Sequence, residues 1–365
     1  MDFQSGLEMA GYVRRKGVSK GTHDPLEAFC IYMKGGSTET AILVYDLLGI
    51  PEGFPSEHEN VKIVPVATHT HSAPKPSLVF EEILRYGEKL VEEAVKGAKN
   101  VEKMMVRRTR VRGICDFRDR DEETSLPVVS MEFQLEDEKF GIIIFHCHPT
   151  VLGPENLMYS SDLAGGIRRK LEEKLSHPVV YLNSCCGNVS TNRTRRERSF
   201  DEVDRLAELF VRNLRWEEEM ESTPMEFEFR EYTLSLPLVR KDFDGLKVDD
   251  RAKPGLELLR RRKIREGFEE SKVSVVRIGS VKLVFLPFEM FLESCLKLDK
   301  NVILINYAHH YRSYVVPMGT EGTYEWIVSP YSEEAEGMIL NFLKRVVDGE
   351  DDGGMRESFG RDRMA

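Results

Sequence analysis

Two His-x-His pairs, each directly after an apolar run, constrain this chain more than any other feature. The first pair spans His69–His71 and follows Val61–Thr68; the second spans His146–His148 and follows Gly141–Phe145. Because alternate side chains of a β-strand point to opposite faces, the two imidazoles of each pair share a face. Strand ends with accessible imidazoles are common positions for metal sites. The spacing therefore predicts a metal site, and two buried, hydrogen-bonded histidine pairs are the structural alternative.

Length and charge limit the class of protein. The chain has 365 residues, enough for one large core, and a formal net charge of −10, which argues against a nucleic-acid partner. No apolar run of about 18 residues could span a bilayer, and the N-terminal residues lack the pattern of a secretory signal. The six cysteines show no CxxC spacing and are expected to be reduced thiols. We expect a cytoplasmic protein with a small-molecule partner and no integral membrane association; the sequence assigns no oligomeric state.

Helical and strand-like patterns interleave along the chain, which predicts an α/β fold. We expect a mixed β-sheet core with several hairpins and flanking helices in a single large domain. Strand patterns cover Ala41–Asp46, Val61–Thr68, Val128–Leu135, Phe140–Phe145, Val179–Asn183, Met225–Leu236, Lys272–Ile278, Lys282–Leu286 and Val302–Asn306. Helical spacing covers Leu78–Lys99, Leu163–Leu175, Phe200–Trp216, Gly255–Phe268 and Glu333–Val347.

Two charged segments are predicted to lie outside this core. The segment Val239–Glu270 is expected to form an excursion or a lid, since it is highly charged. The domain is expected to span residues 1–348, and residues 349–365 are predicted to be a disordered tail because they cannot bury apolar surface. No internal repeat is visible.

Three further polar clusters each follow an apolar strand pattern. The loop Asn183–Asn192 is rich in small residues and contains Ser190, Leu283–Glu289 ends in a carboxylate after a proline, and Asn306–Tyr314 is dense in polar aromatics. A catalytic zinc site takes three or four nitrogen and oxygen ligands and activates a water molecule at its open position. Two histidines and a glutamate from separate strand ends meet that requirement.

Taken in order, these motifs resemble the catalytic domain of the neutral ceramidases, which are zinc-dependent amidases. The resemblance runs from Met9 to about Met338. The motifs that carry it are Met9-Ala10-Gly11-Tyr12, Gly21-Thr22-His23, Ala67–Ser72, His148-Pro149-Thr150, Ser161-Asp162, Gly187–Asn192, Pro287-Phe288-Glu289, Ser313-Tyr314-Val315 and Tyr324-Glu325. The ordered set is specific, although each motif alone is weak.

The resemblance implies one Zn²⁺ per chain, held by His69, His148, Glu289 and Tyr314. It also implies that His71 is the acid/base that protonates the leaving amine. The activity it implies is hydrolysis of a linear amide bond, of the N-acyl kind, by metal-activated water.

Three more residues would contact the substrate if the resemblance holds. Ser190 is either a nucleophile or, in a zinc mechanism, a hydrogen-bond donor to the substrate or oxyanion. No Gly-x-Ser-x-Gly motif surrounds it, which argues against a serine hydrolase. Arg118 and Tyr324 match polar residues of the family that contact the substrate.

The chain departs from the family in places that bear on specificity. The loop Ser72–Pro76 has no glycines and is more cationic, Asn188 replaces an aspartate, and Thr191 replaces a proline. The family's C-terminal β-sandwich is not found, which suggests a short, prokaryotic-type member. The zinc chemistry is therefore expected to transfer better than the specificity for ceramide.

Two other functions are consistent with parts of the pattern. His-x-His after a strand also opens the metal site of barrel-shaped phosphoesterases and cyclic amidohydrolases. A catalytically inactive relative that binds a ligand in the same cleft is the third hypothesis. The family pattern gives no role to His146, which is expected to be a supporting residue, or to His309 and His310, which could line the pocket.

Overall fold

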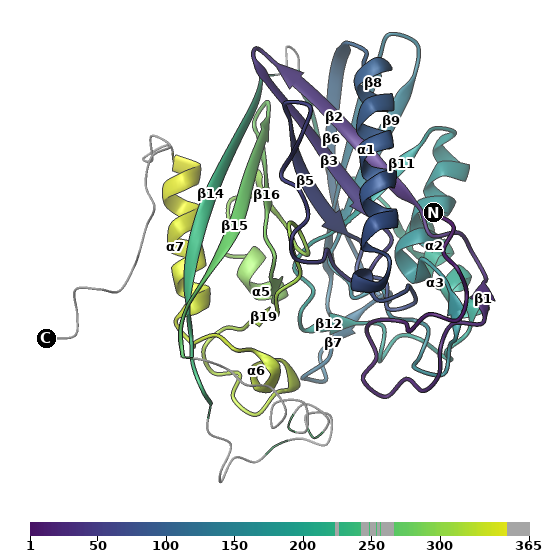
Figure 1. Ribbon diagram of the computed structural model, residues 1–365, viewed down its shortest axis with the longest axis vertical. Coiled ribbons are helices and arrows are strands. Elements are labelled where there is room, and N and C mark those ends of the chain that lie inside the picture. Colours follow the sequence, from purple (N-terminus) through teal and green to yellow (C-terminus); the bar gives the residue numbers. More distant parts are fainter. Residues whose placement is uncertain (223–225, 242–247, 249–252, 254–255, 257–265, 349–365) are drawn as a thin grey trace, which may run out of the picture.

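Three large β-sheets form the body of the protein. The computed structural model describes residues 1–222, 226–241, 248, 253, 256 and 266–348 (Figure 1). The first sheet has the order β2-β3-β5-β4, with β2 Ala28–Gly35, β3 Thr38–Tyr45, β4 Glu57–His58 and β5 Val61–Ala67. The second has the order β11-β9-β8-β6-β13, with β6 Val101–Val111, β8 Leu126–Leu135, β9 Lys139–Phe145, β11 Val179–Asn183 and β13 Glu218–Ser222. The third has the order β14-β15-β16-β18, with β14 Phe227–Leu238, β15 Gly267–Ile278, β16 Val281–Phe285 and β18 Val302–Ile305.

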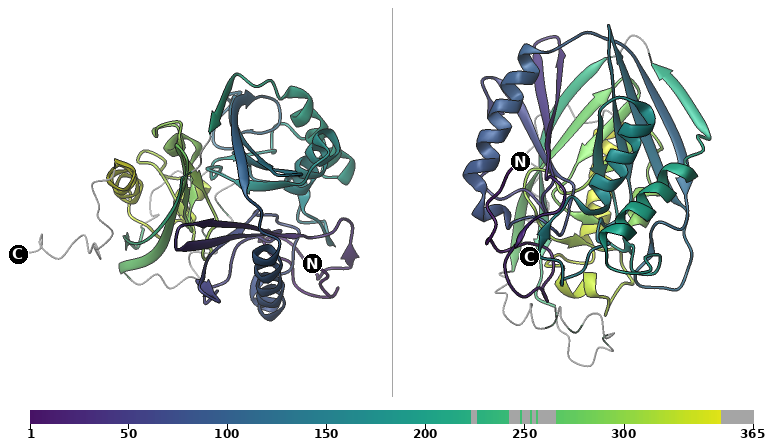
Figure 2. Two further views of the ribbon diagram at one scale, coloured as in Figure 1. Left: turned by 90° about the horizontal axis from the view of Figure 1, so that it is seen from above. Right: turned by 90° about the vertical axis from the view of Figure 1, so that its right-hand side faces the viewer.

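The three sheets pack around a shared apolar core. Buried residues of all three form one cluster, which includes Ile42 of β3, Ile144 of β9 and Phe285 of β16. Viewed from above, the sheets surround this centre and the helices lie outside them (Figure 2). In β3, Ile42 faces the shared core while Leu43 belongs to a second, outer cluster. Each sheet is therefore buried on both faces, which explains the nearly continuous apolar runs of the sequence.

Helices cover the outer faces of the sheets. Ile83 and Val91 of α1 (Phe80–Lys96) lie in the outer cluster with residues of the first sheet, and α1 contacts β2. The second sheet is covered by α2 (Asp162–Leu175) and α3 (Phe200–Asn213), and the third by α7 (Ala335–Asp348). Among the described residues, no helix has both the length and the apolar character needed to cross a bilayer.

The same strand pairing recurs in all three sheets. Each contains an antiparallel hairpin whose second strand pairs in parallel with one further strand: β2-β3-β5, β8-β9-β11 and β15-β16-β18. The carboxyl ends of parallel strands are where ligands bind in open sheets. The loops after β5, β9, β11, β16 and β18 carry the predicted site residues, and they meet at one end of the molecule. Short ladders join these loops: β7 Asp116–Phe117 with β12 Val189–Ser190, and β17 Glu289–Met290 with β19 Tyr314–Val315.

The structure confirms the α/β class and the single-domain architecture. The predicted strands are present within a few residues of their expected bounds, as are four of the predicted helices. The hairpin of β15 and β16 turns at Gly279, whose φ of +58° lies in the left-handed region that glycine adopts without strain. The strands β2, β6 and β13 were not predicted. Their charged or half-exposed residues obscure the alternation.

Some predictions concern residues that the structure does not describe. The described residues leave out most of the predicted helix Gly255–Phe268 and most of the predicted excursion or lid Val239–Glu270. They also leave out the whole predicted tail, residues 349–365. The end of the predicted helix is wrong, because Gly267 and Phe268 begin strand β15 and pair with Leu238 and Pro237.

The expectation that all cysteines are reduced thiols is wrong for four of them. Disulfides join Cys115 to Cys147 and Cys185 to Cys295, with Cα atoms 6.1 and 6.2 Å apart. The partners are separated by 32 and 110 residues, so no short motif reveals them. Cys147 directly precedes His148, which places one disulfide beside the predicted metal site.

Candidate metal centre and substrate pocket

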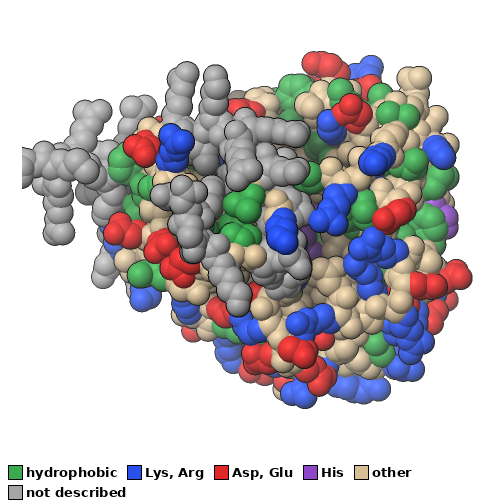
Figure 3. All heavy atoms as spheres, turned by 90° about the horizontal axis from the view of Figure 1, so that it is seen from below, with side chains coloured by type: hydrophobic (Ala, Val, Ile, Leu, Met, Phe, Trp, Pro, Cys, Tyr) green, Lys and Arg blue, Asp and Glu red, His purple; other side chains and the backbone are tan. Residues whose placement is uncertain are grey.

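A pocket of about 1100 Å³ lies where the strand-end loops meet. It opens on the lower face of the molecule, where a histidine side chain is visible in a hollow (Figure 3). Every residue that the sequence predicts for the site lines this pocket: His69, His71, Arg118, His148, Ser190, Glu289, Tyr314 and Tyr324. Their roles remain predictions, but their assembly from loops of all three sheets is a finding.

His69 is held in a fixed orientation at the end of β5. Its φ is +69°, a left-handed conformation that is uncommon for a residue with a side chain. Its Nδ1 lies 2.6 Å from the Leu48 carbonyl oxygen, and the Tyr307 ring stacks on the imidazole with centroids 3.8 Å apart. Since Nδ1 donates to a carbonyl, the neutral ring presents the lone pair of Nε2 to the pocket.

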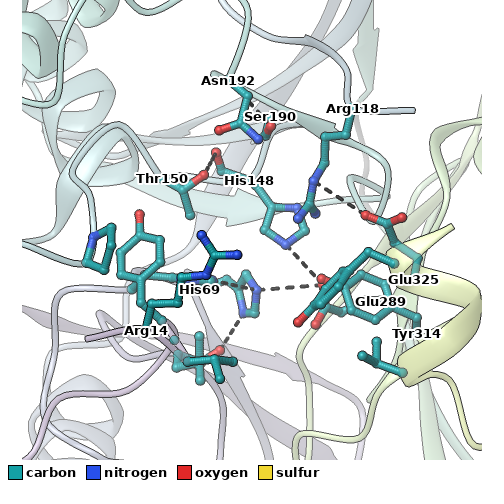
Figure 4. Close-up of a pocket in the computed structure, with 18 of the residues that line it drawn as sticks. Arg14, His69, Arg118, His148, Thr150, Ser190, Asn192, Glu289, Tyr314 and Glu325 are labelled. Carbon is teal, nitrogen blue, oxygen red and sulfur yellow. Dashed lines mark hydrogen bonds and ion pairs between the residues drawn. The ribbon is translucent and has the colours of Figure 1, made fainter. Parts of the chain in front are cut away.

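His148 is oriented in the same way after β9. Its Nδ1 lies 2.7 Å from the carbonyl oxygen of Cys186, and its main chain forms a bridge with Ser190. Its Nε2 is buried and lies 3.1 Å from Glu289 Oε2, while His69 Nε2 is 3.7 Å from the same oxygen (Figure 4). The Nε2 atoms of two imidazoles therefore converge on one oxygen of the same carboxylate.

Glu289 is an almost completely buried carboxylate at the start of β17. Oε1 accepts a hydrogen bond from Tyr311, and Oε2 lies 3.4 Å from the Tyr307 hydroxyl. Burial alone would raise its pKa, but the neighbouring His69, His148 and Tyr311 outweigh burial and lower the pKa to about 2. Among the ion pairs of the described residues, no Lys or Arg neutralises this carboxylate, so the site favours a cation.

Tyr314 lies next to Glu289 on the adjacent strand. The two residues are Cα partners in the parallel ladder of β17 and β19, and Tyr314 is buried. Burial raises the pKa of its phenol well above the ordinary value, while the charge of Arg118 lowers it. The backbone ladder thus places the phenol beside the convergent histidines.

His71 differs from the other two histidines. Its Nε2 lies 3.3 Å from His69 Nε2, but its Nδ1 is buried and has no hydrogen-bond partner among the described residues. The ring packs against Tyr12, with centroids 4.9 Å apart, and against Gly11, where an added Cβ would lie 2.4 Å from the ring. His69, His71 and His148 could together hold an ion, since their ligand atoms lie within 4.8 Å of one another. In His69 and His148 a carbonyl fixes Nδ1 and so orients the ring, whereas His71 lacks this contact among the described residues.

Ser190, Arg118 and Tyr324 line the pocket around these groups. Ser190 is buried in β12, and its main chain pairs with β7. Arg118 donates from Nη1 to the Gly187 carbonyl at 3.0 Å, and its Nε lies 3.5 Å from Glu325 Oε1. Tyr324 begins α6 (Tyr324–Val328), and its ring lies edge-on to Tyr314 with centroids 6.2 Å apart.

Other histidines do not enter the pocket. His146 is buried, and its Nδ1 lies 3.1 Å from the Cys185 carbonyl oxygen, in agreement with a supporting role. Burial lowers its pKa to about 4. His309 and His310, which could have lined the pocket, are not among its lining residues.

Sequence reasoning missed the residues that orient the predicted ones. Tyr307 and Tyr311 contact Glu289, and Glu325 pairs with Arg118. The dense polar aromatics of Asn306–Tyr314 were a signal for the two tyrosines. Only the three-dimensional structure assigns their partners.

We call His69, His71, His148, Glu289 and Tyr314 the floor of the pocket. The floor fits a divalent ion such as Zn²⁺ because two imidazole Nε2 atoms meet a buried, ionised carboxylate. His148 Nε2 makes no hydrogen bond of good geometry among the described residues and faces the Glu289 oxygen at 3.1 Å, an arrangement that a shared ion would satisfy. The nitrogen and oxygen donors and the partly open pocket are typical of a catalytic rather than a structural zinc site.

Comparison with known proteins shows a ceramidase-like fold. Two solved structures are similar: a neutral ceramidase from Pseudomonas aeruginosa and a ceramidase complexed with C2. Each has a TM-score of 0.72 and 14% sequence identity, and the match covers 97% of this chain and 74% of the other. No protein-family model and no curated protein sequence matches the chain. At this identity the likeness shows the fold alone.

Proposed function

We propose that this protein is a zinc-dependent hydrolase that cleaves a linear amide bond of the N-acyl kind. The observation that carries the proposal is the convergence of His69 Nε2, His148 Nε2 and the buried Glu289 carboxylate on the pocket floor. The ceramidase-like fold supports it, because both structural neighbours are ceramidases. In this proposal one zinc ion is held by these three residues and by Tyr314.

The side chains around the floor have separate tasks in this reaction. A zinc ion bound there supplies an activated water nucleophile and polarises the substrate carbonyl. His71 moves a proton through Nε2 to the leaving nitrogen, since its position beside His69 puts it within reach of the reacting groups. Ser190 donates a hydrogen bond to the developing oxyanion.

Arg118 and Tyr324 hold the substrate in place. The Arg118 guanidinium is fixed by the Gly187 carbonyl and by Glu325, so it is oriented before the substrate arrives. Such fixed donors stabilise a transition state without reorganisation at the moment of reaction.

The rival functions are less well supported. The barrel-type phosphoesterases and cyclic amidohydrolases need repeated βα units, whereas the three sheets here mix antiparallel hairpins with parallel strands. The cytoplasmic location, the small-molecule partner and membership as a short form without a β-sandwich domain stay predictions.

The test is amide hydrolysis by purified protein with a measured metal content. We expect about one zinc per chain, turnover of at least one member of a panel of N-acyl amides, loss of turnover after chelation, and recovery when zinc is returned. Full amidase activity in protein shown to be metal-free would contradict the proposal. Two or three metals per chain would favour the phosphoesterase type, and ligand binding without turnover would favour the inactive relative.

A further inference from the structure

The pocket walls above the floor carry arginines, although the whole chain has a net charge of −10. Four of them line the pocket and are called the rim here: Arg14, Arg195, Arg198 and Arg312. Several Lys and Arg side chains lie beside the hollow on this face of the molecule (Figure 3). A positive rim on an acidic protein concentrates anions at one site.

The four rim arginines differ in how they are engaged. Arg312 pairs with Glu269 through Nη1 and Oε1 at 3.0 Å, and Arg198 pairs with the exposed Glu155 at 3.1 Å. Arg14 is exposed, and among the described residues it has no ion pair or hydrogen bond; its guanidinium points into the pocket (Figure 4).

Arg195 is fixed but not neutralised. Nη1 donates to the Thr150 carbonyl at 2.7 Å, and no carboxylate pairs with Arg195 among the described residues. Arg195 is half-buried, so its charge is partly removed from water without a counter-ion from the chain. A planar guanidinium in this state is suited to bind a carboxylate.

A fifth arginine strengthens the positive charge on the same side. Arg15 lies over the Tyr12 ring, with Cζ 5.0 Å from the centroid, and donates to the Ala10 carbonyl. Its Nε and Nη2 are buried and have no hydrogen-bond partner among the described residues. Buried donors of this kind are costly unless a ligand or water satisfies them.

The positive charge of Arg15, Arg195 and Arg198 lies on the side of the pocket where His71 is found. Tyr12 contacts the His71 ring and donates a hydrogen bond to the Leu152 carbonyl. The charges of Arg195, Arg15 and Arg198 all act on the Tyr12 phenol and lower its pKa, although burial raises it overall. Because His71 is proposed to protonate the leaving nitrogen, the half of the substrate nearest these charges is the amine half.

The pocket wall combines aliphatic, aromatic and cationic side chains. Among the described residues of the pocket wall, the aliphatic side chains are those of Val13, Leu48, Pro154 and Val328. Pockets that bury long apolar chains are lined mainly by apolar side chains. With the rings of Tyr12, Tyr311, Tyr314 and Tyr324, these aliphatic side chains give the pocket an apolar surface for an acyl chain beside the cationic rim, which a neutral lipid would not use.

We propose that the substrate is an N-acyl amino acid, whose carboxylate on the amine half is bound by Arg14 and Arg195. This inference rests on the proposed function. In the reaction the amide C–N bond breaks and a C–O bond to water forms. Both protons of the water end on the nitrogen, one when the C–N bond breaks and one from the carboxylic acid that forms, so the products at neutral pH are a fatty carboxylate and an amino acid with a protonated amine.

The experiment compares matched amides on the zinc-loaded protein. N-octanoylglycine and N-octanoylethanolamine differ chiefly in carboxylate against hydroxymethyl, and an N-octanoylaminoethyl phosphate tests the other common anion. We expect kcat/KM for the carboxylate to exceed that for the alcohol about a hundredfold, as for a charge-assisted pair inside a pocket. We expect Arg14→Gln to reduce this ratio about tenfold, mainly through KM. Arg85→Gln, which removes an exposed arginine of α1 outside the pocket, should leave the ratio unchanged.

The outcomes separate this inference from the proposed function. Equal hydrolysis of the acid and the alcohol, with no effect of Arg14→Gln on their ratio, overturns the inference and leaves the amidase standing. A phosphate preferred more than about tenfold over the carboxylate overturns the assignment of an amino acid. If no amide is hydrolysed, the proposed function fails, and calorimetric binding of N-octanoylglycine decides the inference. Binding that Arg14→Gln weakens supports it, and no binding overturns it.

Discussion

The floor and the rim of the pocket are built in opposite ways. The floor residues are almost all buried, and the chain fixes them through carbonyls at His69 and His148 and through tyrosines at Glu289. The rim residues are exposed or half-buried, and Arg14 and Arg195 pair with no carboxylate in the described structure. This difference fits the proposed division of labour, in which the floor carries out the chemical step and the rim binds the substrate's anionic group.

We expect the largest effect from removing a zinc ligand of the floor. Replacing His148 by Ala removes one of the two oriented Nε2 donors, so bound zinc should be lost. Turnover should fall at least about a thousandfold, because the metal supplies several kcal/mol of transition-state stabilisation. Elemental analysis and amide hydrolysis measure the two losses. His146→Gln is the matched control two residues away and should keep zinc. Equal zinc loss in a folded His146→Gln protein would mean that both histidines of the second pair are needed to hold the ion.

A smaller effect separates the acid/base from the ligands. We expect His71→Gln to keep its zinc, since His71 lacks the Nδ1 anchor of the other two histidines. Its kcat should fall about a hundredfold or more, as for loss of a general acid. Loss of zinc from this variant would instead make His71 a ligand and would remove Tyr314 from the proposed set.

The next effect concerns the support of Glu289. Tyr311→Phe removes the hydroxyl that donates to Oε1, so zinc affinity should fall about 10- to 100-fold, as for other residues that orient a ligand. Competition with a chromophoric chelator gives the affinity. Tyr32→Phe removes a comparable tyrosine–glutamate hydrogen bond, to Glu39, far from the pocket and should leave it unchanged.

A further prediction concerns the segment that contains Val151 and Leu152, which follows His148 of the floor. The Asp162 carboxylate accepts hydrogen bonds from the backbone N–H groups of Val151, Leu152 and Leu163, at 3.0, 3.2 and 2.8 Å. An amide in place of one oxygen cannot accept from all three, so Asp162→Asn should lower the free energy of unfolding by about 1–3 kcal/mol. Urea unfolding measures this change. The exposed Asp201→Asn is the control, and equal stability of the two variants would show that Asp162 does not hold this segment.

The smallest effect tests the rim without a mutation. Exposed charges are screened by salt, and the Debye length shortens from about 30 Å at 0.01 M to about 10 Å at 0.1 M. Over this range kcat/KM for N-octanoylglycine should fall about threefold to tenfold. N-octanoylethanolamine should show little change. The same salt dependence for both amides would mean that the rim does not bind the anionic group.

The sequence predicted the floor better than the rim for a physical reason. The polar clusters that contain the floor residues each follow an apolar strand, which is visible because both faces of each sheet are buried. The resemblance to the neutral ceramidases then singled out the residues within these clusters. The rim arginines come from segments that are far apart in the sequence, and each reads as an ordinary charged loop. Their shared place on the pocket wall appears only after three sheets have packed around one centre.

The same reason explains the other misses. The repeated hairpin-plus-parallel-strand unit is a repeat of pairing, not of residue identity, so no period is visible in the sequence. The charges of β6 and β13 hide their alternation. The disulfide partners Cys185 and Cys295 are 110 residues apart and meet only in the folded chain, where Cys295 of α5 (Leu292–Cys295) packs against the apolar cluster that contains Cys185.

The most direct test of the central claim is a crystal structure of the zinc-loaded protein with anomalous data at the zinc edge. The account predicts one strong peak on the floor, within about 2.0–2.2 Å of Nε2 of His69, Nε2 of His148 and an oxygen of Glu289. The Tyr314 oxygen should complete the set, and His71 should stay outside it. No peak on the floor, or a peak bound elsewhere in the chain, would contradict the claim.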